Sequence, residues 1–241
     1  MAIFENEYTI SFRDLGNSNC ITNKAFLSFM ENIGGMHSDS VGLGINDIEK
    51  TNLSWVLLGW KVKIIKRALY GEVIHAKTWA RHTNKFFTHR DFEFYDSKGE
   101  LIAIATSKWV LIDINKQHLC KITDDILEMY KPETKTVFEN SDIDKLEEPS
   151  TFSDIYTYIV QRSNIDINNH MHNLDYLDVA YEFLPEKVYY NCDLKNVEIM
   201  YKKEIKLGDN IKCLYSFENG FHYITMKSED EKILHAIVKL Y

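Results

Sequence analysis

The polar cluster at residues 164–173 is the part of the sequence best equipped for chemistry. Its sequence is NIDINNHMHN. In an extended segment side chains alternate between faces, so we expect Asp166, Asn168 and His170 to project to one side. An amide N–H can stabilise an oxyanion, an imidazole can donate or move protons near neutral pH, and a carboxylate can orient both. Asp and Asn are also common in turns and at helix caps. The spacing alone therefore leaves both a catalytic and a structural interpretation open.

A second candidate, Glu204, stands at the end of an apolar strand-like segment, within the sequence YKKEI at 201–205. A solvated charge at a strand end is the more frequent role of such a residue. Three lysines surround it, namely Lys202, Lys203 and Lys206. Exposed lysines are common on any surface, but a basic rim at this place predicts docking of an acidic partner.

Several other kinds of site are not supported by the sequence. It contains no Gly-x-Ser-x-Gly elbow and no glycine-rich phosphate loop. His170 and His172 form a His-x-His pair without a third ligand at a sensible spacing, so we expect no metal and no cofactor. The cysteines are Cys20, Cys120, Cys192 and Cys213. None forms a Cys-x-x-Cys pair, which excludes a zinc ribbon or a thioredoxin motif. The cysteines also show no disulfide framework, so we expect a reducing compartment, the cytoplasm.

Composition and charge further narrow the classes of protein to which this chain can belong. The 241 residues are 45% hydrophobic and carry a formal net charge of -8. Nucleic-acid binding needs a basic face, so we do not expect a nucleic-acid partner. No apolar run reaches the roughly 18 residues that a membrane span requires.

The pattern of elements is typical of an α+β protein in which each half has a helix followed by antiparallel strands. The first helix is expected to begin after the N-cap Asn23 and to end near Gly34 or continue raggedly toward Gly42. The second is capped by Asn173 and closed by Pro185. The expected strands are 54–65, 72–78, 86–95, 101–112, 196–201, 210–217, 221–227 and 233–240.

The two halves also match residue by residue, which indicates a duplicated domain. Residues 14–23 align with 164–173, each position 150 later. We therefore expect domains at 1–130 and 151–241, joined by an acidic, proline-containing linker at 131–150. At the places of Asp166, Asn168 and His170 the first copy has Gly16, Ser18 and Cys20. The first copy is thus expected to keep the fold without catalytic residues.

The same segments carry a family resemblance. Residues 164–173 resemble the Asp-x-Asn-x-His-x-Asn-Asn signature of plant and bacterial acyl-acyl-carrier-protein (acyl-ACP) thioesterases, and 201–205 resembles their Tyr-Arg-Arg-Glu-Cys segment. Thr78-Trp79, Arg90-Asp91 and 107–111 are similar to strand motifs of that family. The likeness runs from about residue 8 to the end of the chain.

This resemblance implies two tandem hot-dog domains, each an antiparallel sheet wrapped around a central helix. It implies hydrolysis of a fatty acyl thioester on the phosphopantetheine arm of acyl carrier protein, which ends fatty acid biosynthesis. The family's catalytic residues map onto Asp166, Asn168, His170 and Glu204, with Glu204 as general base or nucleophile. The sequence departs from the family at Ile205, which excludes a cysteine nucleophile there, and at His172, where the signature has Asn.

An acyl chain needs an apolar tunnel, and the aromatic-rich N-terminal domain is expected to supply it. The candidate lining residues are Phe26, Phe29, Trp55 and Trp60. Ordinary core packing is the competing interpretation of each. Three other functions stay open: an acyl-CoA thioesterase of the hot-dog class, a non-catalytic acyl or carrier-protein binding module, and a hot-dog hydratase. Acyl chain length and the choice between monomer and homodimer also stay open.

Overall fold

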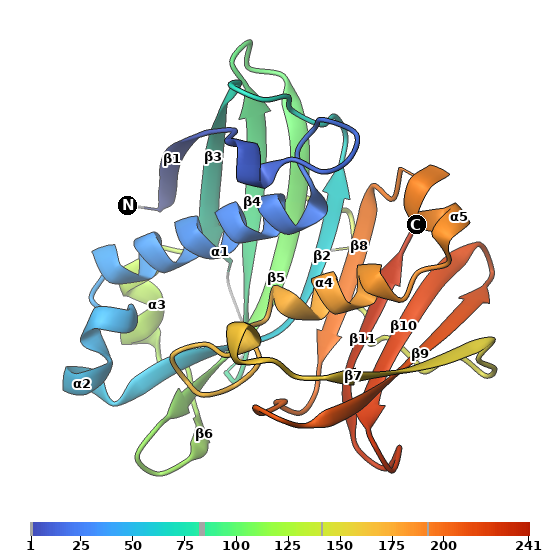
Figure 1. Cartoon of the computed structure of the whole chain (residues 1–241). Helices are drawn as coiled ribbons and strands as arrows, with labels where there is room; N and C mark the ends of the chain where they lie inside the picture. The colour runs from blue at the N-terminus through green and yellow to red at the C-terminus, as the bar shows by residue number, and fades with distance from the viewer. Residues whose placement is uncertain (1, 82–84, 141, 192) are drawn as a thin grey trace. The chain divides into compact units, whose positions relative to one another are not determined.

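The computed structural model describes residues 2–81, 85–140, 142–191 and 193–241, so Cys192 lies outside the described residues. The chain divides into two compact units, Met1–Ile143 and Asp144–Tyr241. The division falls inside the segment 131–150 that we expect to be a linker. Each unit contains one antiparallel sheet and helices, as the α+β prediction requires (Figure 1).

The sheet of unit 1 has the strand order β1-β3-β4-β5-β2, with β6 paired to β5. Its strands are β1 (Ile3–Thr9), β2 (Leu53–Ile64), β3 (Val73–Ala80), β4 (Thr88–Asp96), β5 (Leu101–Asp113) and β6 (His118–Cys120). Its helices are α1 (Asn23–Ser40), α2 (Ile48–Thr51) and α3 (Asp124–Tyr130). The four expected strands are present within a few residues of their predicted bounds.

Helix α1 lies across the sheet of unit 1 and continues through Gly34 and Gly35 to Ser40, so the earlier of the two expected ends is wrong and the continuation toward Gly42 is confirmed. Its N-cap is Thr22, whose side chain accepts a hydrogen bond from the Ala25 N–H at 3.1 Å, so the prediction of Asn23 as N-cap is wrong. Gly34 lies above Arg90, and a Cβ there would be 3.3 Å from Arg90 Cδ. The glycine therefore lets the helix approach the sheet closely instead of ending it.

The C-terminal half of α1 covers a buried polar network that the sequence did not indicate. Arg90 is 7% exposed and its Nη1 lies 2.8 Å from His37 Nδ1. Its guanidinium also lies 5.6 Å from the centre of the Tyr130 ring. The Tyr130 hydroxyl accepts from Trp55 Nε1 and donates to Ser38 Oγ, both at 3.0 Å. Burial lowers the pKa of Arg90 to about 10.

Part of the expected linker packs on the opposite face of the unit 1 sheet. The Val137 N–H donates to Asp91 Oδ2 at 3.1 Å, and Trp79 Nε1 donates to the Lys135 carbonyl at 3.0 Å. Lys135 also pairs with Glu93 at 2.6 Å. Asp91 has no exposed surface, and its burial raises the pKa of the carboxyl.

The sheet of unit 2 has the strand order β8-β11-β10-β9-β7. Its strands are β7 (Asp154–Ile159), β8 (Asn196–Tyr201), β9 (Asn210–Glu218), β10 (Phe221–Ser228) and β11 (Leu234–Leu240), and its helices are α4 (Asp175–Glu182) and α5 (Glu186–Asn191). The four expected strands are confirmed. The N-cap of α4 is Leu174 and not Asn173, whose carbonyl instead accepts from the Tyr201 hydroxyl at 2.8 Å.

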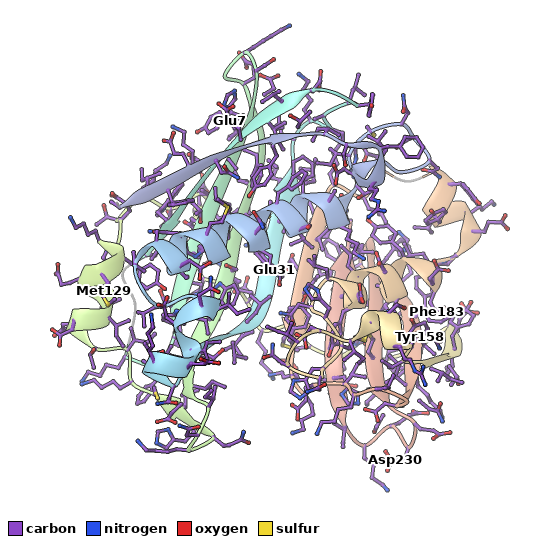
Figure 2. The ribbon with its side chains drawn as sticks, turned by 60° about the vertical axis from the view of Figure 1, so that its left-hand side comes forward. Glu7, Glu31, Met129, Tyr158, Phe183 and Asp230 are labelled. Atoms are coloured by element: carbon purple, nitrogen blue, oxygen red, sulfur yellow. The ribbon has the colours of Figure 1, made fainter. Side chains whose placement is uncertain are left out.

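The first strand of each unit, β1 and β7, was not expected. Among the described residues, each of the two strands pairs with one neighbour, β1 with β3 and β7 with β9. In β1, Glu5 pairs with Lys77 at 2.8 Å and Glu7 lies 3.0 Å from His75. In β7, the Tyr158 ring lies edge-on to Phe183 with the ring centres 6.4 Å apart (Figure 2).

The backbone supports the duplication, because the same bonds recur 150 residues apart. Asn19 and Asn169 both adopt the left-handed conformation, with φ of 56° and 61°. Isolated bridges join Leu15 to Ile21 and Ile165 to Met171. Within the described part of the chain, no helix is long and apolar enough to cross a membrane.

Candidate active site

Residues 166–170 form a tight turn, so the prediction of an extended segment is wrong. The Asp166 N–H donates to the His170 carbonyl at 2.9 Å, and the Asn169 N–H donates to the Asp166 carbonyl at 3.1 Å. Asn169 provides the left-handed residue that the turn needs. The side chains therefore gather because the backbone folds back, and not because they alternate along a strand.

Asp166 organises this turn through both of its carboxylate oxygens. Oδ1 accepts the backbone N–H groups of Asn168 at 2.8 Å and His170 at 3.2 Å. Oδ2 accepts one hydrogen of Asn168 Nδ2 at 3.2 Å, which leaves the second amide hydrogen for another acceptor. The half-buried His170 ring makes no hydrogen bond with the described residues, so its nitrogens are open to a ligand.

Glu204 is held next to this turn by a backbone hydrogen bond between the two segments. The Met171 N–H donates to the Ile205 carbonyl at 2.8 Å, and the residues just before these two are His170 and Glu204. The Glu204 side chain is 37% exposed, and Lys203 Nζ lies 3.0 Å from its Oε1. Lys203 lowers the pKa of the Glu204 carboxyl, and His170 lowers it further. The Glu204 carboxylate therefore lies close enough to the His170 imidazole for the two groups to interact electrostatically.

A buried tyrosine at this site was not predicted. Tyr176, on α4, is 3% exposed, and its ring lies edge-on to Tyr201 at 5.2 Å between centres. Burial raises the pKa of the Tyr176 hydroxyl, and the charges of Glu204 and Asp166 raise it further, while a hydrogen bond with the backbone of Ile205 opposes them. The available signal was the repeat, since the first copy has the apolar Phe26 at this place.

The chain's departure from the signature at His172 has a local explanation. His172 Nδ1 accepts a hydrogen bond from the Leu174 N–H at 3.2 Å, just before α4 begins. The ring therefore stabilises the start of the helix.

Comparison with known proteins identifies the family. Residues 1–130 match the family model of the acyl-ACP thioesterase N-terminal domain, and residues 147–239 match that of the acyl-ACP thioesterase C-terminal domain. The chain belongs to the acyl-ACP thioesterase family. It is 25% identical over 228 residues to oleoyl-acyl carrier protein thioesterase 1, chloroplastic, of Arabidopsis thaliana. That match covers 88% of this chain and 63% of the relative, so the chain spans less than two thirds of its curated relatives.

Solved structures of the family share the fold over the whole chain. The 12:0-ACP thioesterase from Umbellularia californica superposes with a TM-score of 0.88 at 19% identity, covering 100% of this chain and 96% of that one. An acyl-ACP thioesterase from Bacteroides thetaiotaomicron gives 0.85 at 20% identity, covering 99% and 97%. The predicted α+β fold of two tandem hot-dog domains is confirmed.

The aromatic residues expected to line the acyl tunnel have different surroundings. Phe26 and Trp60 have no exposed surface and belong to the core of unit 1. Phe29 stacks on Tyr8 with ring centres 4.4 Å apart, and Trp55 donates to the Tyr130 hydroxyl. These contacts match core packing, and the role of the four residues in binding an acyl chain stays a prediction.

The lysines expected to dock a carrier protein are on the surface of unit 2. Lys202 and Lys206 are exposed, and the backbone N–H of Lys206 donates to Asp209 Oδ2 at 2.9 Å. Lys203 is 57% exposed and paired with Glu204. Exposed lysines therefore flank Glu204 along the chain, and their docking role stays a prediction.

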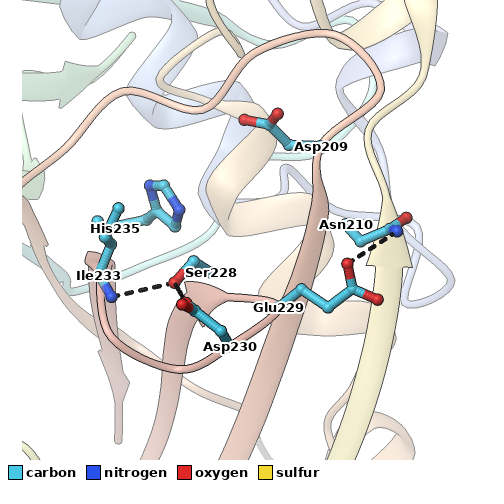
Figure 3. A pocket seen from close by; sticks show the side chains of 7 residues that line it. All are labelled: Asp209, Asn210, Ser228, Glu229, Asp230, Ile233 and His235. Carbon is cyan, nitrogen blue, oxygen red and sulfur yellow. Dashed lines mark hydrogen bonds between the residues drawn. The ribbon is translucent and has the colours of Figure 1, made fainter.

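A separate open pocket in unit 2 does not contain the candidate residues (Figure 3). Its lining residues are Asp209, Asn210, Ser228, Glu229, Asp230, Ile233 and His235. Hydrogen bonds within the pocket engage several of them: Ser228 Oγ donates to Asp230 Oδ1 at 2.7 Å, and Asn210 Nδ2 donates to Glu229 Oε2 at 3.3 Å. Its carboxylates would repel an anionic ligand.

Proposed function

We propose that this protein hydrolyses a fatty acyl-ACP thioester to a free fatty acid and the carrier thiol, the reaction that ends fatty acid biosynthesis. Family membership and the names of the relatives support this proposal. The observation that carries it is the Met171–Ile205 hydrogen bond, because it joins the Glu204 segment to the Asp166–His170 turn. One bound carbonyl can thereby be reached by an amide, an imidazole and two carboxylates, which belong to Asn168, His170, Asp166 and Glu204.

In the proposed mechanism, Glu204 acts on a water molecule. Its carboxylate takes a proton as the water oxygen bonds to the thioester carbon, and the carbonyl electron pair moves onto oxygen. The C–S bond of this tetrahedral intermediate then breaks, and the departing sulfur takes the proton from Glu204. Glu204 is ionised at neutral pH, since its pKa lies below the usual range of a carboxyl that is itself acidic, and only the ionised form can accept a proton.

Asn168 and His170 stabilise the oxyanion in this mechanism. The free amide hydrogen of Asn168 and a ring N–H of His170 are the donors, and Asp166 fixes the amide by accepting its other hydrogen. Loss of one such donor typically costs about 100-fold or more in rate. Direct attack by Glu204 on the thioester carbon is the alternative within the same site.

The proposal assigns different tasks to the two domains. Residues 151–241 supply the catalytic groups, and residues 1–130 hold the acyl chain with Phe26, Phe29, Trp55 and Trp60 as the candidate lining. Lys202, Lys203 and Lys206 dock the acidic carrier. A reducing cytoplasm fits the free thiols of the described cysteines, which are Cys20, Cys120 and Cys213.

The test compares one acyl chain on two carriers. The purified protein is given the same acyl group as an acyl-ACP and as an acyl-CoA, and the released thiol and free acid are both measured. We expect equal amounts of both products and faster turnover of acyl-ACP. Faster turnover of acyl-CoA would instead favour the CoA thioesterase, and water addition to an enoyl group without acid release would favour the hydratase.

A matched pair of variants separates catalysis from mere binding. His170→Ala should lower turnover strongly, whereas Glu229→Gln, in the acidic pocket of the same unit, should leave it unchanged. Binding of acyl-ACP by the wild-type protein without any release of acid would identify the non-catalytic module and overturn the proposal.

A further inference from the structure

The peptide groups that lead into Glu204 are fixed to strand β11. The backbone N–H groups of Lys202 and Lys203 donate to the His235 carbonyl at 2.8 Å and 3.3 Å. On its other side, Glu204 is followed by Ile205, which is bonded to the catalytic turn. The carboxylate therefore stands between two anchored points of the backbone.

The side chain of His235 adds a third bond to this anchor. Its Nδ1 lies 3.0 Å from the Lys203 carbonyl oxygen. A carbonyl can only accept, so Nδ1 carries the hydrogen in this bond. His235 is 6% exposed, and its ring borders the acidic pocket (Figure 3). The ring thus fixes the rotation of the peptide that joins Lys203 to Glu204.

The first copy of the domain provides an internal comparison. There the N–H groups of Ile65 and Lys66 donate to the Ile102 carbonyl at 2.8 Å and 3.1 Å, so Ile102 occupies the place of His235. Ile102 is 1% exposed and has no side-chain donor. The backbone anchor is common to both copies, whereas the imidazole bond occurs in the copy that carries the candidate site.

We propose that His235 is a positioning residue for Glu204, acting through its hydrogen bond to the Lys203 carbonyl. This inference rests on the proposed function, since it concerns the orientation of the catalytic base. Small displacements of a reacting group lower the rate of the chemical step and leave substrate binding largely intact. The role therefore predicts an effect on kcat and not on KM.

Two amide variants of His235 test the inference. Asn places its side-chain N–H close to the position of Nδ1, whereas Gln places it near Nε2. With acyl-ACP as substrate, we expect His235→Asn to keep nearly the wild-type kcat and His235→Gln to lower kcat by about 10- to 100-fold with KM unchanged. Melting temperatures of both variants should be alike. His222→Gln is the control: it removes the ring that bonds the Tyr215 hydroxyl at 2.9 Å on neighbouring strands, and it should leave kcat unchanged.

The outcomes distinguish the two proposals. A wild-type protein that releases no acid refutes the proposed function. An active wild-type protein whose Asn and Gln variants have equal kcat, high or low, overturns only the positioning role. His235→Ile, which copies the buried Ile102 of the first domain, provides a second variant without a donor, and a wild-type kcat in that variant would also overturn the role.

Discussion

At the scale of single residues, the candidate site is a set of side chains held by a short turn and one backbone bond. The residue types and their spacing were visible in the sequence, as was Glu204. The turn was not, because a left-handed Asn169 replaces the expected extended backbone. Tyr176 was missed because, in a sequence, a buried tyrosine among the apolar residues of a helix is indistinguishable from core packing.

Lys203 gives a prediction at this scale. It is the main cause of the lowered pKa of Glu204, and a general base works only when deprotonated. Lys203→Met should raise that pKa, so the acidic limb of the kcat–pH profile should move to higher pH. Lys202→Met, at the exposed neighbouring position, should leave the limb in place. Identical acidic limbs in the two variants would show that Lys203 does not tune Glu204.

At the scale of elements, the interior strands were predictable and the outer ones were not. Strands such as β8 and β11 are rich in Val, Ile, Leu and Met and are mostly buried. Strand β7 is largely exposed, and β1 alternates glutamates with partly buried residues, so neither shows a clear hydrophobic pattern. The end of helix α1 stayed open between Gly34 and Gly42 in the prediction because glycine is a weak helix former, and the close approach of Gly34 to Arg90 is visible only in the structure.

The two glycines of α1 allow a stability test. Glycine in a helix interior is worth about 1 kcal/mol less than alanine. A Cβ at Gly35 would meet no atom within 4 Å, so Gly35→Ala should raise the free energy of unfolding by up to that amount. At Gly34 the new methyl would press on Arg90, which His37 and Thr78 hold in place, so Gly34→Ala should give no gain or a loss. Chemical denaturation measures both, and equal gains would contradict the close approach.

At the scale of the whole molecule, the chain contains two copies of one fold whose residues differ at the place of the candidate site. In the first copy, the Ile21 N–H donates to the Ala68 carbonyl at 2.9 Å, and this bond corresponds to the Met171–Ile205 bond of the second copy. The residue before Ala68 is Arg67, so Arg67 occupies the place of Glu204. Arg67 instead donates to the Ile21 carbonyl at 2.9 Å. The duplication was predictable from aligned residues and turns. The packing of residues 135–137 on unit 1 was not, because their polar composition is typical of a linker.

This asymmetry predicts that Cys20 takes no part in turnover. Its Sγ lies 3.0 Å from Ser18 Oγ, at the places that correspond to His170 and Asn168. Cys20→Ala should therefore leave kcat and KM for acyl-ACP unchanged, and steady-state hydrolysis assays measure both. Loss of turnover in this variant would mean that the first copy also contributes catalytic groups.

The most direct test of the account is single-turnover hydrolysis of acyl-ACP by the wild-type protein and by Glu204→Gln. The amide keeps the shape of the side chain but cannot accept a proton from water. We predict unchanged binding of acyl-ACP and a fall in the rate of acid release by about 100-fold or more. Acid release at the wild-type rate by Glu204→Gln would contradict the central claim that hydrolysis requires the Glu204 carboxylate.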